Sequence, residues 1–186
     1  HRDLHSFPTR RSSDLIVRNQ VNGVIGVRKY VALDLEEIYL FLKENPNAYI
    51  PKIYECIQTD TNLIVIEEYL SGKNLEEMLK EKYFSEKDAA DIIICLCNAL
   101  YPLHHAKMPV ICRDLKAENV ILTNEGEVKL VDFDIARIYQ PGKSKDTVMM
   151  GTQGYAAPEQ FGFGQTDART DIYAMGVLLN YMLERE

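Results

Sequence analysis

Residues 112–119 read Cys-Arg-Asp-Leu-Lys-Ala-Glu-Asn, and residues 132–134 read Asp-Phe-Asp. Asn124-Glu125-Gly126 lies between these stretches and is a typical turn signal. The residues around the stretches form short β-branched runs typical of strands, at 109–111, 120–122 and 128–131. The sequence therefore predicts a hairpin and places two carboxylates, an amide and a lysine on loops at strand ends. Phosphoryl transfer uses such a set, to orient a hydroxyl, hold magnesium and offset charge.

Four motifs in this order resemble the eukaryotic-type protein kinases, on their serine/threonine branch. Residues 112–119 match the catalytic loop H-R-D-x-x-x-x-N with Cys112 in place of His, and residues 132–134 match D-F-G with Asp134 in place of Gly. Residues 151–159 match the segment that ends in A-P-E, and residues 171–176 match the start of the buried helix that anchors the catalytic loop. We expect a bacterial member of the family.

The resemblance implies an α+β, bilobal kinase fold that is incomplete at both ends. Residues 16–70 would form part of the β-rich smaller lobe, and residues 71–186 part of the helical larger lobe. The Gly-rich phosphate loop should precede the first lobe segment and is missing, and the chain ends before the last helices of the larger lobe. We therefore expect that the chain as it stands does not catalyse.

Residues 1–15 read HRDLHSFPTRRSSDL and open on a second His-Arg-Asp. No strand-like run precedes it, and no Asn stands five residues after Asp3. The stretch resembles the translation of a common sequencing-adapter oligonucleotide, so we expect a disordered, non-native addition outside the fold. A disordered native arm is the alternative.

The resemblance also implies the roles of the loop residues. Asp114 would accept or orient the proton of the substrate hydroxyl, and Lys116 would steady the transferring phosphoryl group. Asn119 and Asp132 would hold Mg²⁺, with ATP as the phosphoryl donor. Lys116 and Thr152 together favour transfer to Ser or Thr of a protein substrate. Cys112 and Asp134 replace no group that touches phosphate.

In the smaller lobe, Asn22-Gly23 predicts a hairpin turn, and residues 24–31 should then be the family's third strand. Alternation places Val27 and Lys29 on one face and Arg28 on the other. The resemblance puts that first face toward the nucleotide, so Lys29 is the expected phosphate-contacting lysine. A solvated lysine at the sheet edge is the alternative.

Residues 35–45 are predicted to form a helix capped by Asp34. The resemblance places here a glutamate that pairs with the strand lysine, and Glu36 and Glu37 both qualify. Glu37 is favoured because three apolar residues would then face inward: Ile38, Phe41 and Leu42. Glu37 could instead close a capping box with Asp34.

Residues 67–72 resemble the hinge between the two lobes. The backbones of Glu68 and Leu70 would meet adenine there. Glu67 falls at the position that guards the back of the nucleotide pocket, where the family usually has an apolar residue. A plain linker between a strand and a helix is the alternative.

The remaining helices are predicted at residues 74–82, 85–106 and 172–183, from their apolar spacing. His104 and His105, at the end of the second, are expected to be surface or capping residues and not ligands. Arg113 could pair with a phosphate on the activation segment, at Ser144 or, as we favour, Thr147. An unmodified loop is the alternative.

Composition limits the partners. The net charge of −7 argues against general binding to nucleic acid or membrane surfaces. The four cysteines show no disulfide or metal-ligand spacing, which suits a cytoplasmic protein, and no apolar run is long enough for a membrane helix. Two other functions remain open: a pseudokinase that binds nucleotide as a scaffold, and a kinase of small molecules. The protein-substrate segment at 151–159 argues against the second.

Overall fold

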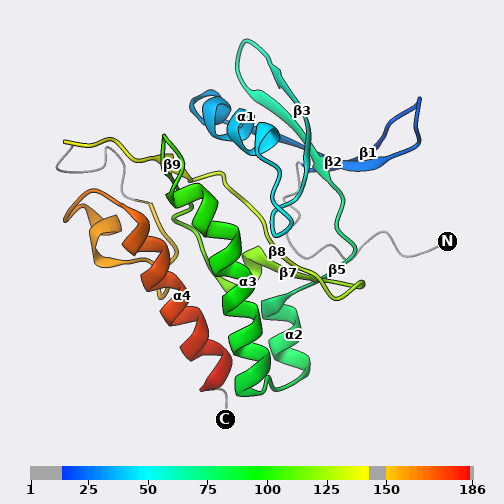
Figure 1. Ribbon diagram of the computed structural model, residues 1–186. Helices are drawn as coiled ribbons and strands as arrows, with labels where there is room; N and C mark the ends of the chain where they lie inside the picture. Colours follow the sequence, from blue (N-terminus) through cyan, green and yellow to red (C-terminus); the bar gives the residue numbers. More distant parts are fainter. Residues whose placement is uncertain (1–13, 143–149, 185–186) are drawn as a thin grey trace.

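The computed structural model of the protein describes residues 14–142 and 150–184 (Figure 1). The two candidate phosphorylation sites, Ser144 and Thr147, lie outside the described residues, as do the first thirteen residues of the adapter-like stretch. A β-rich part and a helical part follow each other along the chain, and the strands β7 and β8 lie between them in space (Figure 1).

The β-rich part is a four-stranded antiparallel sheet in the order β1-β2-β4-β3. Its strands are β1 (Leu15–Arg18), β2 (Ile25–Val31), β3 (Ile53–Gln58) and β4 (Leu63–Glu68). The hairpin predicted around Asn22-Gly23 is present, and Gly23 has a φ of 73°. Its loop is longer than a two-residue Asn-Gly turn, because Arg18 pairs with Ile25 and the backbone N–H of Asn19 donates to the carbonyl of Val24 over 2.8 Å. Leu15 pairs with Arg28 and Asp14 is buried, so the sheet begins inside the stretch expected to be non-native.

Helix α1 (Glu36–Glu44) packs against β3 and follows directly on the 3-10 turn η1 (Leu33–Leu35). Its buried side chains are Ile38, Tyr39 and Leu42. The expected cap by Asp34 is wrong: the residue before the helix is Leu35, and no side chain caps α1. Asp34 cannot cap α1 because η1 runs straight into α1, which leaves Asp34 within a helical turn instead of just before one.

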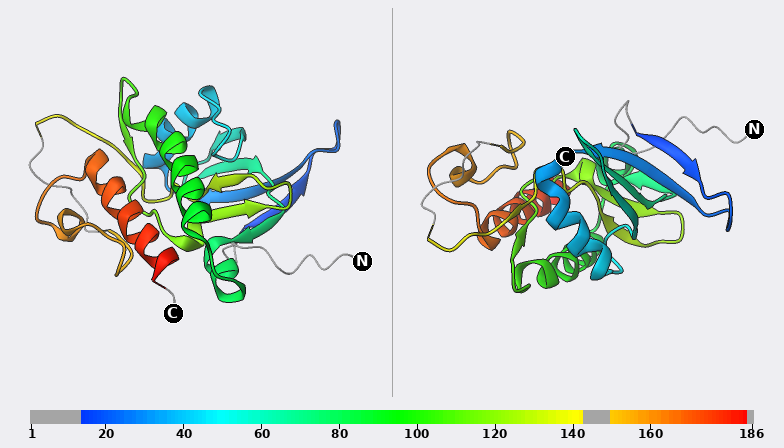
Figure 2. Two further views of the ribbon diagram at one scale, coloured as in Figure 1. Left: turned by 60° about the horizontal axis from the view of Figure 1, so that its bottom comes forward. Right: turned by 90° about the horizontal axis from the view of Figure 1, so that it is seen from above.

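The helical part contains α2 (Leu75–Glu81), α3 (Glu86–His104) and α4 (Ala168–Leu183). Asn74 caps α2 and Ser85 caps α3, each in a capping box with the acidic residue three positions on. Helix α3 packs against α4 and against β8. In both views of Figure 2, α4 lies on the side of the molecule away from the β1–β2 hairpin.

The remaining elements are short strands and 3-10 turns in the segments that connect these helices. The predicted strands are present, and β7 and β8 form the predicted hairpin. Strands β5 and β9 were not predicted, because they have only three and two residues. The elements are β5 (Gly72–Asn74), β6 (Val110–Ile111), η2 (Ala117–Asn119), β7 (Val120–Thr123), β8 (Val128–Leu130), β9 (Arg137–Ile138) and η3 (Pro158–Phe161).

Strand β5 begins the helical part by pairing with β7, with Gly72 opposite Thr123. A Cβ atom at Gly72 would overlap the backbone of Leu122 and Thr123. This position therefore needs glycine for close approach of two backbones and not for an unusual φ.

One apolar cluster runs through both parts of the described chain, from α1 through α3 to α4. The four cysteines are free thiols, as expected, and they range from the buried Cys112 to the exposed Cys97. Within residues 14–142 and 150–184, no helix is both long and apolar enough to cross a membrane.

Helix α3 offers a direct test of this core. Leu96 is 0% exposed, whereas Ile94, two residues earlier, is 56% exposed. Leu96→Ala should lower the free energy of unfolding by about 2–5 kcal/mol, because it leaves a cavity beside α4 and β8. Ile94→Ala, the matched control, should change it by no more than about 0.5 kcal/mol. Urea unfolding followed by circular dichroism measures both, and equal losses would contradict this packing.

Candidate active site

Asp114, on the loop after β6, accepts hydrogen bonds at both carboxylate oxygens. The Thr152 hydroxyl donates to Oδ1 over 2.7 Å, and the Asn119 amide nitrogen donates to Oδ2 over 2.9 Å. Lys116 Nζ lies 2.9 Å from Oδ2 and donates to the Thr152 hydroxyl over 3.0 Å. The structure thus brings together the three residues predicted to be catalytic. It adds Thr152 from the activation segment.

Asn119 also joins this cluster to the loop of Asp132. The backbone N–H of Val131 donates to the carbonyl of Asn119 over 2.9 Å, which sets the two loops side by side. The Asn119 amide nitrogen is directed at Asp114, so its amide oxygen is the atom open to a cation. That oxygen and the Asp132 carboxylate are hard ligands of the kind Mg²⁺ prefers, and Mg²⁺ usually completes its shell with waters and substrate phosphates. The donor set fits magnesium. No group of three His, Cys, Asp or Glu side chains suited to a metal ion occurs in the described part of the chain.

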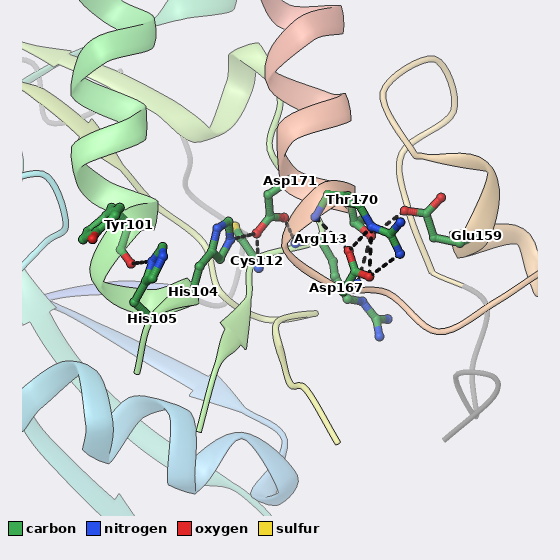
Figure 3. A network of polar contacts seen from close by, with 10 residues as sticks. Tyr101, His104, His105, Cys112, Arg113, Glu159, Asp167, Thr170 and Asp171 are labelled. Carbon is green, nitrogen blue, oxygen red and sulfur yellow. Dashed lines mark hydrogen bonds and ion pairs between the residues drawn. The ribbon is translucent and has the colours of Figure 1, made fainter. Parts of the chain in front are cut away.

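Asp171, near the start of α4, anchors the catalytic loop (Figure 3). Its carboxylate accepts the backbone N–H of Cys112 over 2.9 Å and that of Arg113 over 2.8 Å. His104 Nε2 lies 2.7 Å from the same carboxylate. Arg113 has a φ of 68°, a strained value for a residue other than glycine, and the bonds to Asp171 hold the backbone there. The helix predicted from residues 171–176 to anchor the catalytic loop therefore does so through the Asp171 carboxylate.

Residue 112 contributes only its backbone N–H to the contact with Asp171, and any residue except proline can supply that group. The Cys112 side chain is 0% exposed. Burial, and then the charge of Asp171, raise the pKa of its thiol well above the usual value. The replacement of His by Cys therefore keeps the contact to Asp171 and places a neutral, buried thiol beside it.

Two further residues of this network were not predicted from the sequence. His104 was expected to be a surface or capping residue, but its side chain is 7% exposed and pairs with Asp171. Only its place in the last turn of α3 could have hinted at this. Gln160 is buried and donates from Nε2 to the carbonyl of Arg113 over 2.9 Å and to that of Met150 over 2.7 Å. It fastens the segment 151–159 to the catalytic loop.

Lys29 is buried on β2, but its partner differs from the expected one. Its Nζ lies 2.5 Å from Oε1 of Glu67, on β4, with both side chains about one-tenth exposed. Burial alone would lower the pKa of Lys29, but the charge and hydrogen bond of Glu67 raise it above the usual value. Burial raises the pKa of Glu67, and Lys29 offsets part of that rise. The alternative of a solvated edge lysine is excluded.

The expected pair of Lys29 with Glu37 is wrong. Glu37 is exposed and lines a pocket of about 610 Å³ between α1 and the segment 134–141. The physical reason is the rotation of α1, which buries Ile38 and Tyr39 and so turns the neighbouring glutamate outward. Capping of α1 by Asp34 also does not occur, so Glu37 closes no capping box.

The other expected nucleotide contacts lie along the same sheet. Val27 is half-buried and sits opposite Glu67 in the β2–β4 ladder. The backbone N–H of Glu68 donates to the carbonyl of Lys52 over 2.8 Å, and Leu70 is half-buried beyond the end of β4. Contacts of Val27, Glu68 and Leu70 with adenine remain predictions.

Comparison with known proteins agrees with this geometry. The model of the family described as "Protein kinase domain" matches residues 27–186. An EPD1-interacting receptor-like cytoplasmic serine/threonine-protein kinase 5D of Gossypium barbadense is 34% identical over 88% of the chain and 35% of its own length. A probable serine/threonine-protein kinase of Corynebacterium efficiens is 32% identical over 90% of the chain and 27% of its own length. The probable serine/threonine-protein kinase PknB of Corynebacterium glutamicum is 40% identical over 62% of the chain and 18% of its own length.

The chain thus spans at most 35% of the length of these relatives, which come from both plants and bacteria. The family match covers most of the chain and includes the loops that hold Asp114 and Asp132 and the helix that holds Asp171. The chain belongs to the protein kinase family, and the relatives that place it there are serine/threonine kinases.

Proposed function

We propose that this chain is the catalytic part of a kinase that transfers the γ-phosphoryl group of ATP to Ser or Thr hydroxyls of proteins. The observation that carries the proposal is the Asp114 carboxylate, which Thr152, Asn119 and Lys116 hold at once. Two of these donors belong to the catalytic loop and the third, Thr152, comes from the activation segment, so the carboxylate is held from both segments.

Asp114 would accept the proton of the substrate hydroxyl as that oxygen approaches phosphorus. Its position supports this role, because the side chain is only partly buried and so can be reached from the surface. Lys116 lies beside both Asp114 and Thr152, where its charge would offset the negative charge of the phosphoryl group in transfer.

The nucleotide and metal would be held by residues on the other loop and the sheet. When bound, ATP would supply the phosphoryl group and Mg²⁺ would neutralise its charge. Asn119 and Asp132 would ligate the ion, and Lys29 would contact phosphate oxygens from β2. Positioning is the main contribution of the protein to this chemistry, so the spatial arrangement of these side chains matters more than their chemical reactivity.

Preference for a protein Ser or Thr is supported by Lys116 and by the segment 151–159. The Thr152 hydroxyl in that segment bridges Asp114 and Lys116, and Gln160 fastens the segment to the catalytic loop. A peptide laid on this segment would bring its hydroxyl to Asp114. The serine/threonine kinases among the relatives support the same substrate class.

Asp114→Asn in the full-length gene product should lower kcat by about 100- to 10,000-fold, because the amide cannot accept the proton. ATP affinity should stay near that of the wild type, since Asp114 acts on the acceptor. Radiolabelled phosphate transfer to a generic protein substrate and fluorescence of a bound ATP analogue measure the two effects. Glu125→Gln, in the exposed turn between β7 and β8, is the control. ATP binding without transfer in the wild type itself would favour a pseudokinase.

Thr152→Ala should lower kcat/KM for a peptide substrate about tenfold or more, because it removes the hydroxyl that bridges Asp114 and Lys116. Thr152→Ser keeps that hydroxyl and should keep most of the activity. Steady-state kinetics with one peptide at saturating ATP compare the two variants. Full activity of Thr152→Ala would show that the bridge does not position the catalytic carboxylate.

A further inference from the structure

The ion pair of Lys29 and Glu67 is built into the sheet. In the β2–β4 ladder Val27 stands opposite Glu67, and Lys29 stands opposite Val65. Lys29 and Glu67 are therefore diagonal neighbours on one face, close enough for a long side chain to reach the other. Their geometry follows from the hydrogen-bonded register of two adjacent strands and does not depend on where α1 lies.

Helix α1 offers Lys29 no carboxylate. The residues of α1 that turn toward the core are Ile38, Tyr39 and Leu42. Its two glutamates in the first turn lie elsewhere: Glu37 is exposed and Glu36 is only partly buried. The other acids whose charge reaches Lys29 are Asp132 and Asp134, on the loop expected to hold magnesium.

We propose that Glu67 is the positioning residue of Lys29, in place of a glutamate from the helix. The inference rests on the proposed function, because Lys29 must contact ATP phosphates for its position to matter. Without Glu67 the Lys29 ammonium would be drawn into ion pairs with Asp132 and Asp134, where it would compete with Mg²⁺ for the Asp132 carboxylate and would itself be less available to phosphate. Glu67, a buried acid at the back of the nucleotide site, thus holds Lys29 where its ammonium can contact the ATP phosphates.

The test compares two ligands that differ only in phosphate. Glu67→Gln should weaken Mg·ATP binding about tenfold or more, because it removes one charge-assisted hydrogen bond to Lys29. Adenosine has no phosphate for Lys29 to contact, so its affinity should change less than about twofold. Isothermal titration of the chain gives both affinities. Glu55→Gln, at an exposed position on β3, is the matched control, and Glu37→Gln is the competing arm.

Each outcome decides a different point. Unchanged ATP affinity of Glu67→Gln, with ATP bound by the wild type, would overturn the positioning role and leave the proposed function standing. Equal losses for ATP and adenosine would also overturn it, since Glu67 would then only support the pocket. If Glu37→Gln lost as much ATP affinity as Glu67→Gln, the residue that positions Lys29 would instead be Glu37 on α1. A wild type that binds neither ligand would refute the proposed function, and the role of Glu67 with it.

Two further variants keep the test usable if Glu67→Gln does not fold. Glu67→Asp retains the charge with a shorter reach and should show a smaller loss for ATP, again with adenosine spared. In a Lys29→Met background, changing Glu67 should no longer alter the ratio of ATP to adenosine affinity. A further change in that ratio would show that Glu67 acts by another route.

A separate contact points to a second role, for Asp134. The Tyr39 hydroxyl donates to Asp134 Oδ1 over 2.9 Å, and the Asp134 backbone N–H donates to Asp132 Oδ1 over 3.2 Å. Tyr39 is 1% exposed, so its hydroxyl needs a partner in the core. Glycine, which the family has at position 134, could not accept this bond. We infer that Tyr39 and Asp134 tie α1 to the loop of the metal-binding Asp132.

A double-mutant cycle tests this tie without any ligand. Tyr39→Phe and Asp134→Asn should each lower the free energy of unfolding, and the double variant should lose less than the sum, because the two changes remove one hydrogen bond. The Mg²⁺ concentration needed for half-maximal ATP binding should rise in Tyr39→Phe. Tyr83→Phe, at a residue that is 78% exposed, is the control. Additive losses with an unchanged Mg²⁺ requirement would overturn the inference.

Discussion

The carboxylate of Asp171 is the contact on which the catalytic loop depends. It accepts two backbone N–H groups from a loop almost sixty positions away in the sequence, and it is 1% exposed. Charge-assisted bonds in such a place are strong, because water cannot compete for them. They allow Arg113 to keep a positive φ that would otherwise relax, and the next residue is Asp114. The position of the Asp114 carboxylate therefore depends on a contact made from α4.

Three departures from the family pattern share one physical logic. Cys112 stands where the backbone makes the contact, so the side chain can change. Asp134 gains a hydrogen bond from Tyr39 that glycine could not make. Glu67 puts a charge where an apolar residue is usual, and Lys29 neutralises it. The two charged replacements, Asp134 and Glu67, are partly buried or buried and each has a partner, which is the condition under which polar groups are tolerated in a core.

Much of the fold followed from the sequence because its signals are local. The β1–β2 hairpin, the cap by Ser85 and the apolar spacing of α3 depend on near neighbours, and all three are present. The partner of Lys29 depends on which strand lies beside β2 and in which register, and alternation within one strand cannot reveal either. His104 was misplaced for the same reason, since its partner lies on a distant helix. Strands β5 and β9 are too short for any periodic signal. The loop residues of the site were grouped correctly, because the motif fixes their spacing.

The burial of Cys112 also has a consequence for redox chemistry. Thiols react with peroxides and alkylating agents as thiolates, and only where reagents can reach them. The Cys112 thiol is fully enclosed, and its pKa is raised, so it stays protonated. Cys112, two positions before Asp114, should therefore react slowly with oxidants and alkylating agents. Cys97, which is exposed on α3, should be oxidised well before Cys112.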